Sequence, residues 1–157
     1  MLSMHKLSAA VSAAILFGLS APAPAQEVRV TIVTILANDR NQIVDSKLTE
    51  VKREVQKREP SLTGYRLGRT GHRDINVGQK EAIKLFDNDE YSADVKLLAR
   101  NDTKKRATIE VKPPQVGAIT YETCYDKFFP IVTRSVVNGE RLIIGIMVKP
   151  VDKAAKP

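Results

Sequence analysis

Residues 128–148 read FFPIVTRSVVNGERLIIGIMV, and this stretch decides the fold. Asn138 and Gly139 separate two runs rich in β-branched and apolar residues, and this residue pair is favoured at the positive φ angles of a two-residue type I′ turn. The stretch therefore predicts a tight β-hairpin. Its second run, 142–148, is apolar except at Gly145, which is typical of a strand covered on both faces. We expect this strand at the centre of a sheet.

Residues 28–36 predict another strand. Polar and apolar side chains alternate at its start, and its end is apolar throughout, so it should begin at an edge and finish inside the domain. The first and last strands are thus the most apolar of the chain. We expect them to be neighbours at the centre of the fold.

One helix is predicted over about 45–59. Asp45 or Ser46 can cap its start, and Pro60 ends it because the residue before a proline avoids the α region. Its apolar residues form one narrow stripe, which needs a sheet to lie on. The stripe consists of Leu48, Val51 and Val55.

Between the helix and the hairpin, short alternating segments recur at intervals of about ten residues, which is typical of an antiparallel meander. They include 62–69 and 74–77, with a turn expected at 70–73, and the clearest alternation lies at 91–97. The predicted fold class is α+β. One helix would pack on a curved, mostly antiparallel sheet or on a small two-sheet sandwich of six to eight strands.

The first 25 residues have the pattern of a secretory signal peptide. Lys6 precedes an apolar run, and Ala23 and Ala25 form a small-residue cleavage pattern before Gln26. The run is too short to span a membrane, which takes about 20 apolar residues. We expect a bacterial, exported protein, periplasmic or extracellular, with one domain at 26–150 and a disordered tail at 151–157.

The expected mature chain is basic. It has 24 basic and 18 acidic residues, a net charge of +6. This charge permits contact with an anionic polymer such as a cell-surface glycan, with lipid headgroups or with nucleic acid. Nucleic acid is not the expected partner, because no nucleic-acid motif is present and the protein is predicted to be exported. The charge does not predict an oligomeric state.

Two resemblances extend these expectations. The segments ILAN (35–38), YRL (65–67), VGQ (77–79) and NGERLII (138–144) resemble a class of small exported bacterial proteins of unassigned function. The hairpin at 130–145 is similar to one near the end of outer-membrane secretins, where a threonine-arginine strand turns at a glycine into an apolar strand. That resemblance implies at most an accessory or ring-associated module.

Residues for catalysis or metal binding are few. Cys124 and His72 are the single cysteine and histidine of the expected mature chain, too few for a transition-metal cluster, and no cofactor fingerprint is present. Cys124 can be a buried inert thiol, an intermolecular disulfide partner or a reactive thiol paired with His72. The acidic run 87–90 is an ordinary turn or a weak calcium site, without the spacing of a calcium loop.

Two groups of side chains are candidate binding surfaces. One is a basic cluster that can hold an anionic group through forked guanidinium contacts or can simply be a solvated loop. It consists of Arg66, Arg69, His72 and Arg73. The other is an aromatic group that can fill the core or supply contact area to a partner. It consists of Tyr121, Tyr125, Phe128 and Phe129.

The sequence favours a non-catalytic exported domain that binds a protein or a cell-envelope component. A secreted enzyme inhibitor is the alternative, since one helix on an antiparallel sheet with exposed turns suits that role. A small thiol hydrolase that uses Cys124 is the least supported function.

Overall fold

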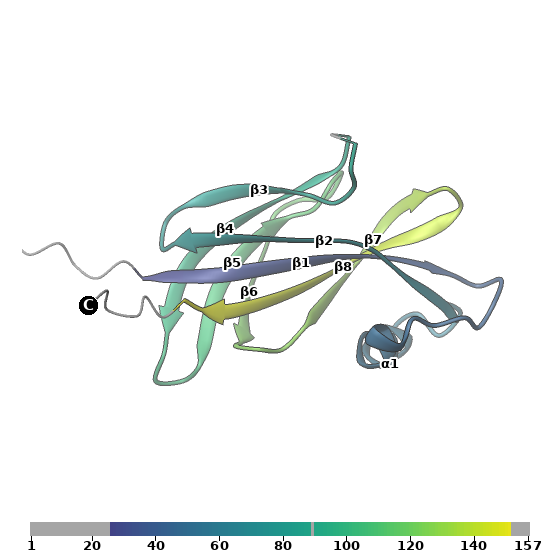
Figure 1. Ribbon diagram of the computed structural model, residues 1–157, viewed down its shortest axis with the longest axis horizontal. Helices are drawn as coiled ribbons and strands as arrows, with labels where there is room; N and C mark the ends of the chain where they lie inside the picture. The colour runs from purple at the N-terminus through teal and green to yellow at the C-terminus, as the bar shows by residue number, and fades with distance from the viewer. Residues whose placement is uncertain (1–25, 89, 152–157) are drawn as a thin grey trace, which may run out of the picture.

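The computed structural model describes residues 26–88 and 90–151, which form eight strands and one short helix (Figure 1). Sheet A has the strand order β2-β1-β8-β7, and sheet B has the order β3-β4-β5-β6. All neighbouring strands are antiparallel. The predicted leader at 1–25 and residues 152–157 of the predicted tail lie outside the described residues.

The strands occupy most of the described chain. Their bounds are β1 (Glu27–Asn38), β2 (Gly64–Asn76), β3 (Lys80–Lys84), β4 (Ser92–Asn101), β5 (Arg106–Lys112), β6 (Ile119–Cys124), β7 (Phe129–Val137) and β8 (Glu140–Pro150).

The two sheets face each other, so the two-sheet alternative is right and a single curved sheet is wrong. Alternate residues of β1 pack against residues of sheet B in one hydrophobic cluster, which includes Val30, Ile32, Val95, Leu97 and Ile109. Each of these side chains is at most 1% exposed. Strands of alternating pattern bury one face each, and facing sheets cover both sets of apolar side chains.

The prediction for the first and last strands is confirmed. β1 pairs with β8 along nearly its whole length, with Val28 opposite Pro150 and Ala37 opposite Arg141. Neighbouring residues of β1 point to opposite faces. Leu36 belongs to the cluster between the sheets, whereas Ile35 belongs to a second cluster beneath the helix.

The closing hairpin is also confirmed. Val137 pairs with Glu140, and the residues between them have φ angles of 52° at Asn138 and 77° at Gly139. Its apolar strand is more exposed than expected at one position, because Met147 is only half-buried. A bulge interrupts the ladder between Val132 and Val136.

The helix is shorter than predicted. A 3-10 turn, Ser46–Leu48, leads into α1, Thr49–Gln56, and Asp45 caps the start by accepting a hydrogen bond from the backbone of Lys47 at 3.0 Å. The expected stripe is buried on the outer face of sheet A. The sequence KRE at 57–59 offers no apolar side chain to that face, so a further turn would bury nothing.

The turn predicted at 70–73 is wrong, because β2 runs without interruption from Gly64 to Asn76. Its glycines serve close packing instead. A Cβ atom on Gly68 would lie 3.1 Å from the carbonyl oxygen of Thr34, and one on Gly71 would lie 3.1 Å from Ile83. Between the pairs Val33–Thr70 and Ile35–Leu67, β2 contains one residue more than β1, and a bulge in β2 accommodates it.

The ends of the described chain lie together. The backbone N–H of Val151 donates to Glu27 at 3.2 Å, so the first residue of the predicted tail is still bound to β1. Within residues 26–88 and 90–151, no helix is long and apolar enough to cross a membrane.

Candidate binding cleft

Sheet A extends beyond sheet B at the end that carries the β7–β8 hairpin (Figure 1). On this extension, α1 packs on the face that carries Ile35 and Tyr65. The opposite face carries Leu36 and is not fully covered by sheet B, which leaves a cleft of about 740 Å³.

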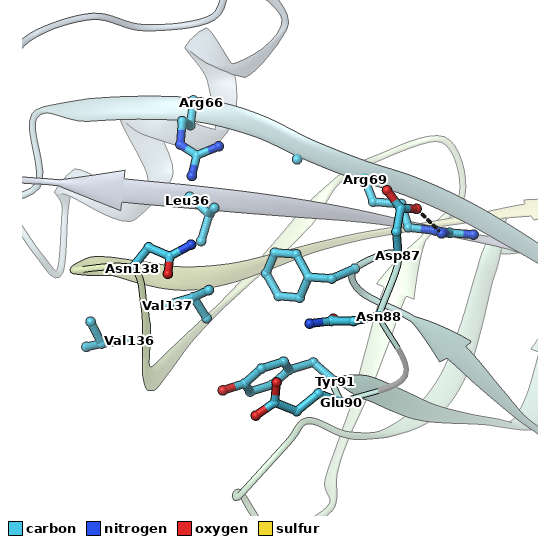
Figure 2. Close-up of a pocket in the computed structure, with 12 residues that line it drawn as sticks. Leu36, Arg66, Arg69, Asp87, Asn88, Glu90, Tyr91, Val136, Val137 and Asn138 are labelled. Atoms are coloured by element: carbon cyan, nitrogen blue, oxygen red, sulfur yellow. Dashed lines mark hydrogen bonds and ion pairs between the residues drawn. The ribbon is translucent and has the colours of Figure 1, made fainter.

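The cleft has two walls and an end (Figure 2). β1 and β2 form one wall, the loop between β3 and β4 forms the other, and the β7–β8 hairpin closes one end. The lining residues are Leu36, Arg66, Gly68, Arg69, Phe86, Asp87, Asn88, Glu90, Tyr91, Val136, Val137 and Asn138.

A hydrogen bond between the sheets positions the β3–β4 loop. The buried hydroxyl of Thr34 donates to the carbonyl of Leu85 at 2.7 Å, and the N–H of Leu85 donates to the carbonyl of Tyr91 at 3.0 Å. Phe86 and Tyr91 then meet edge to face, with ring centroids 5.7 Å apart and an interplanar angle of 76°. This geometry is favourable for two aromatic rings. It fixes an aromatic pair on the wall of the cleft.

Arg66 is held by Glu140, the first residue of β8. Its Nε and Nη2 atoms lie 2.7 and 2.6 Å from the same carboxylate oxygen, and the amide of Asn38 donates to the other oxygen at 3.2 Å. Glu140 is only 8% exposed. The hydrogen bond from Arg66 lowers the pKa of Glu140 below its ordinary value, although burial opposes the shift. The carboxylate therefore locks the hairpin to β1 and β2.

Arg69 connects the two walls. Its Nη1 atom lies 2.5 Å from Asp87 of the β3–β4 loop, and the Asp87 side chain is 98% exposed. An ion pair with so exposed a carboxylate contributes little to stability. It nevertheless neutralises the second guanidinium of the cleft.

The predicted basic cluster is divided in the structure. Arg66 and Arg69 line the cleft, but His72 and Arg73 do not. His72 lies opposite Thr31 and Arg73 opposite Val30, so these two side chains belong to opposite faces of sheet A. The cluster was expected at a turn, but β2 continues through it. His72 lies on the face opposite to that of Arg66, whereas Arg73 lies on the same face as Arg66 but farther along the strand, outside the cleft.

The predicted aromatic group is mostly core. Tyr121 stacks on Phe129 with ring centroids 4.3 Å apart, and both pack against the cluster between the sheets. Tyr125 is buried, and its hydroxyl donates to Asp102 at 2.8 Å. Burial and then that hydrogen bond raise the pKa of Tyr125 to about 12. Phe128 is 43% exposed and is the exposed member of the group, whereas Tyr121 and Phe129 are half-buried.

The candidate thiol pair does not meet. Cys124 ends the edge strand β6 of sheet B, and His72 lies in the edge strand β2 of sheet A. Cys124 is half-buried, and its thiol is free. Among residues 26–88 and 90–151, no three histidine, cysteine or acidic side chains are grouped to hold a metal ion. Asp89 of the acidic run lies outside the described residues.

Sequence reasoning missed several cleft residues. Phe86 and Tyr91 flank the acidic run at 87–90, and this flanking is the local signal that marks the loop. Nothing in the sequence connects the loop with Val137 and Asn138, which lie more than forty positions away. The packing of the two sheets brings the loop and the hairpin together.

In comparisons with known proteins, no protein-family model, no curated protein and no solved structure matches the chain.

Proposed function

We propose that this chain is a non-catalytic exported domain that binds a protein or a cell-envelope component, and that the cleft holds the ligand. The supporting observation is the convergence of aromatic, aliphatic, amide and guanidinium groups from separate segments on one cleft. Its volume of about 740 Å³ lies within the range of ligand sites, roughly 300 to 1,000 Å³.

The export part of the proposal depends on residues 1–25. Cleavage after Ala25 would leave Gln26 at the amino terminus, next to the first residue of β1. The intact mass of protein recovered from outside the cytoplasm should match a chain that begins at Gln26. A retained leader would contradict this part of the proposal and leave the cleft unaffected.

The binding part can be tested with an envelope preparation. The mature domain should sediment with isolated cell envelope, and Tyr91→Ala and Val136→Glu should each weaken this association. Phe128→Ala is the matched control, because Phe128 is a partly exposed aromatic residue that does not line the cleft. Equal sedimentation of parent and both cleft variants would remove the cleft from the function.

The hairpin tip favours a second candidate, the secreted enzyme inhibitor. Val136 is 58% exposed, the turn residues Asn138 and Gly139 are exposed, and the adjacent Glu140 is fixed by Arg66. A protruding loop held in one conformation loses little entropy on binding, which is what a tight inhibitor requires. Inhibition of a secreted hydrolase that is lost with Val136→Glu would favour this candidate.

A further inference from the structure

We propose that the cleft binds a short, neutral oligosaccharide, which gives the proposed cell-envelope function a ligand class and rests on that function. The inference comes from charge, from uncommitted hydrogen-bonding groups, from the aromatic pair and from the state of the nearby sheet edges.

The charges at the cleft argue against an anionic ligand. Arg66 and Arg69 are its described cationic side chains, and each is already bound to a carboxylate. An anion would have to compete with Glu140, which is nearly fully buried and also bound to Asn38. Although the expected mature chain has a net charge of +6, the described arginines of this cleft are both paired with carboxylates.

Hydrogen-bonding capacity nevertheless remains on both walls. Nη1 of Arg66 donates to no other described residue, and the side chains of four more lining residues make no hydrogen bond to the described chain. These four are Asn88, Glu90, Tyr91 and Asn138. Planar amide, carboxylate and guanidinium groups can each contact two adjacent oxygen atoms, and both donors and acceptors are present. Vicinal hydroxyl groups, which both donate and accept, match such a mixed set.

The apolar part of the lining suits the C–H face of a sugar ring. A pyranose ring has a C–H face, which packs against an aromatic ring, and hydroxyl groups around its rim. In the edge-to-face pair of Phe86 and Tyr91, only one ring presents its face to the other, so the pair itself does not cover the faces of the second ring. Both residues line the cleft. Figure 2 shows Tyr91 directed across the cleft toward Val136 and Val137. Aromatic and aliphatic contacts therefore flank the same space.

The start of β2 and the edge of β7 disfavour an extended peptide at the hairpin end of sheet A. Peptides commonly bind by adding a strand to a free sheet edge. The start of β2 is already occupied, because the N–H of Tyr65 donates to Ile43 at 2.9 Å and its carbonyl accepts from Asp45 at 3.0 Å. On the other side of sheet A, β7 contains Pro130, which has no N–H group, and a bulge after Val132. No regular edge is presented to a peptide backbone there.

Titration of the mature domain tests the inference. The probes are cellotetraose and the tetramer of N-acetylglucosamine, which distinguish a plain from an acetamido sugar, with a heparin tetrasaccharide and tetra-alanine as the anionic and peptide probes. Calorimetry should detect millimolar or tighter binding of at least one neutral sugar and none of the other two probes. Binding of the heparin fragment or the peptide alone would overturn the inference, as would no binding at all.

The variants locate the binding. Tyr91→Ala and Asn138→Gly should each weaken sugar binding by about tenfold or more, whereas Phe128→Ala should leave it unchanged. Asn138→Gly keeps the turn, since glycine accepts the φ of 52°, and thermal unfolding confirms that each variant is folded. Equal affinities for parent and folded cleft variants would place the sugar elsewhere and overturn the inference.

The envelope assay separates this inference from the proposed function. If the cleft variants lose envelope binding but neither neutral sugar binds the parent, the ligand class is wrong and the cleft keeps its function. If the variants keep full envelope binding, the domain binds the envelope elsewhere, and the part of the proposed function that places the ligand in the cleft fails.

Discussion

Nε and Nη2 of Arg66 donate to one and the same oxygen of Glu140, and this pair joins the start of β2 to the start of β8 across 74 residues of sequence. The carboxylate is buried while the guanidinium side chain is 55% exposed. Glu140 thus holds the hairpin against β2, and the same contact fixes the position of Arg66 on the wall of the cleft.

Glu140→Gln should lower the free energy of unfolding by about 1 kcal/mol at neutral pH, because a charge-assisted hydrogen bond is replaced by a neutral one. The lowered pKa of Glu140 means that its contribution is present above the ordinary value of 4.5 and is lost as the pH falls through the lower folded value. The difference between parent and variant should therefore shrink in acid. Thermal unfolding at neutral and acidic pH measures it. Asp87→Asn, at a 98% exposed carboxylate, is the control and should change little.

Gly139→Val should destabilise the domain by more than about 1 kcal/mol, because a β-branched residue is strained at a φ of 77°. Space is not the cause, since the nearest atom to a new Cβ is 3.7 Å away on Arg40. Denaturant unfolding compares this variant with Asn138→Gly, which should stay close to the parent. Equal midpoints for both variants would contradict the type I′ turn.

Ile144→Ala should lower the free energy of unfolding by about 2 to 5 kcal/mol, through lost burial and a residual cavity. The Ile144 side chain is fully buried between the sheets, whereas Val136 on the same hairpin is 58% exposed. Val136→Ala should therefore be nearly neutral. If Ile144→Ala unfolds like the parent, β8 is not part of the core.

Two glycine substitutions in sheet A should have opposite outcomes. A Cβ atom on Gly64 would overlap Asn41 and lie 2.8 Å from Oδ1 of Asn38, so Gly64→Ala should cost more than about 1 kcal/mol and disturb the amide that binds Glu140. On Gly145 the nearest atoms are 3.5 to 3.7 Å away, which is ordinary contact. Gly145→Ala should therefore be tolerated within about 0.5 kcal/mol. Thermal unfolding of the two variants side by side distinguishes them.

The central pairing was predictable because its signals are local. Asn138 and Gly139 specify a turn, and the apolar runs at 28–36 and 142–148 require cover on both faces wherever they lie. The single helix was predictable for the same reason, from its cap at Asp45 and its apolar stripe. The end of the helix was not predictable in the same way. It ends at Gln56 rather than near residue 59, because helix length depends on how many apolar side chains the helix can bury.

The cleft was not predictable, because its parts are brought together by contacts distant in sequence. Gly68 and Gly71 are residues typical of a turn. In the structure they lie within a strand, where Thr34 and Ile83 approach so closely that a side chain larger than hydrogen would be crowded. With the turn gone, His72 and Arg73 separate from Arg66 and Arg69. The pairing of β1 with β2, with its register shift, sets the face of each side chain and its distance from the cleft along the strand.

The hydrogen bond from Val151 to Glu27 places both ends of the described chain at the same end of the domain, which determines how the domain would be oriented when it is attached through either terminus. Both ends of the described chain leave from the end of sheet A where β8 finishes, and the cleft lies where β8 starts. The eleven residues of β8 span roughly 35 Å at about 3.3 Å per residue. A tether or a fused protein at either terminus would therefore hold the domain with its cleft facing outward, away from the point of attachment.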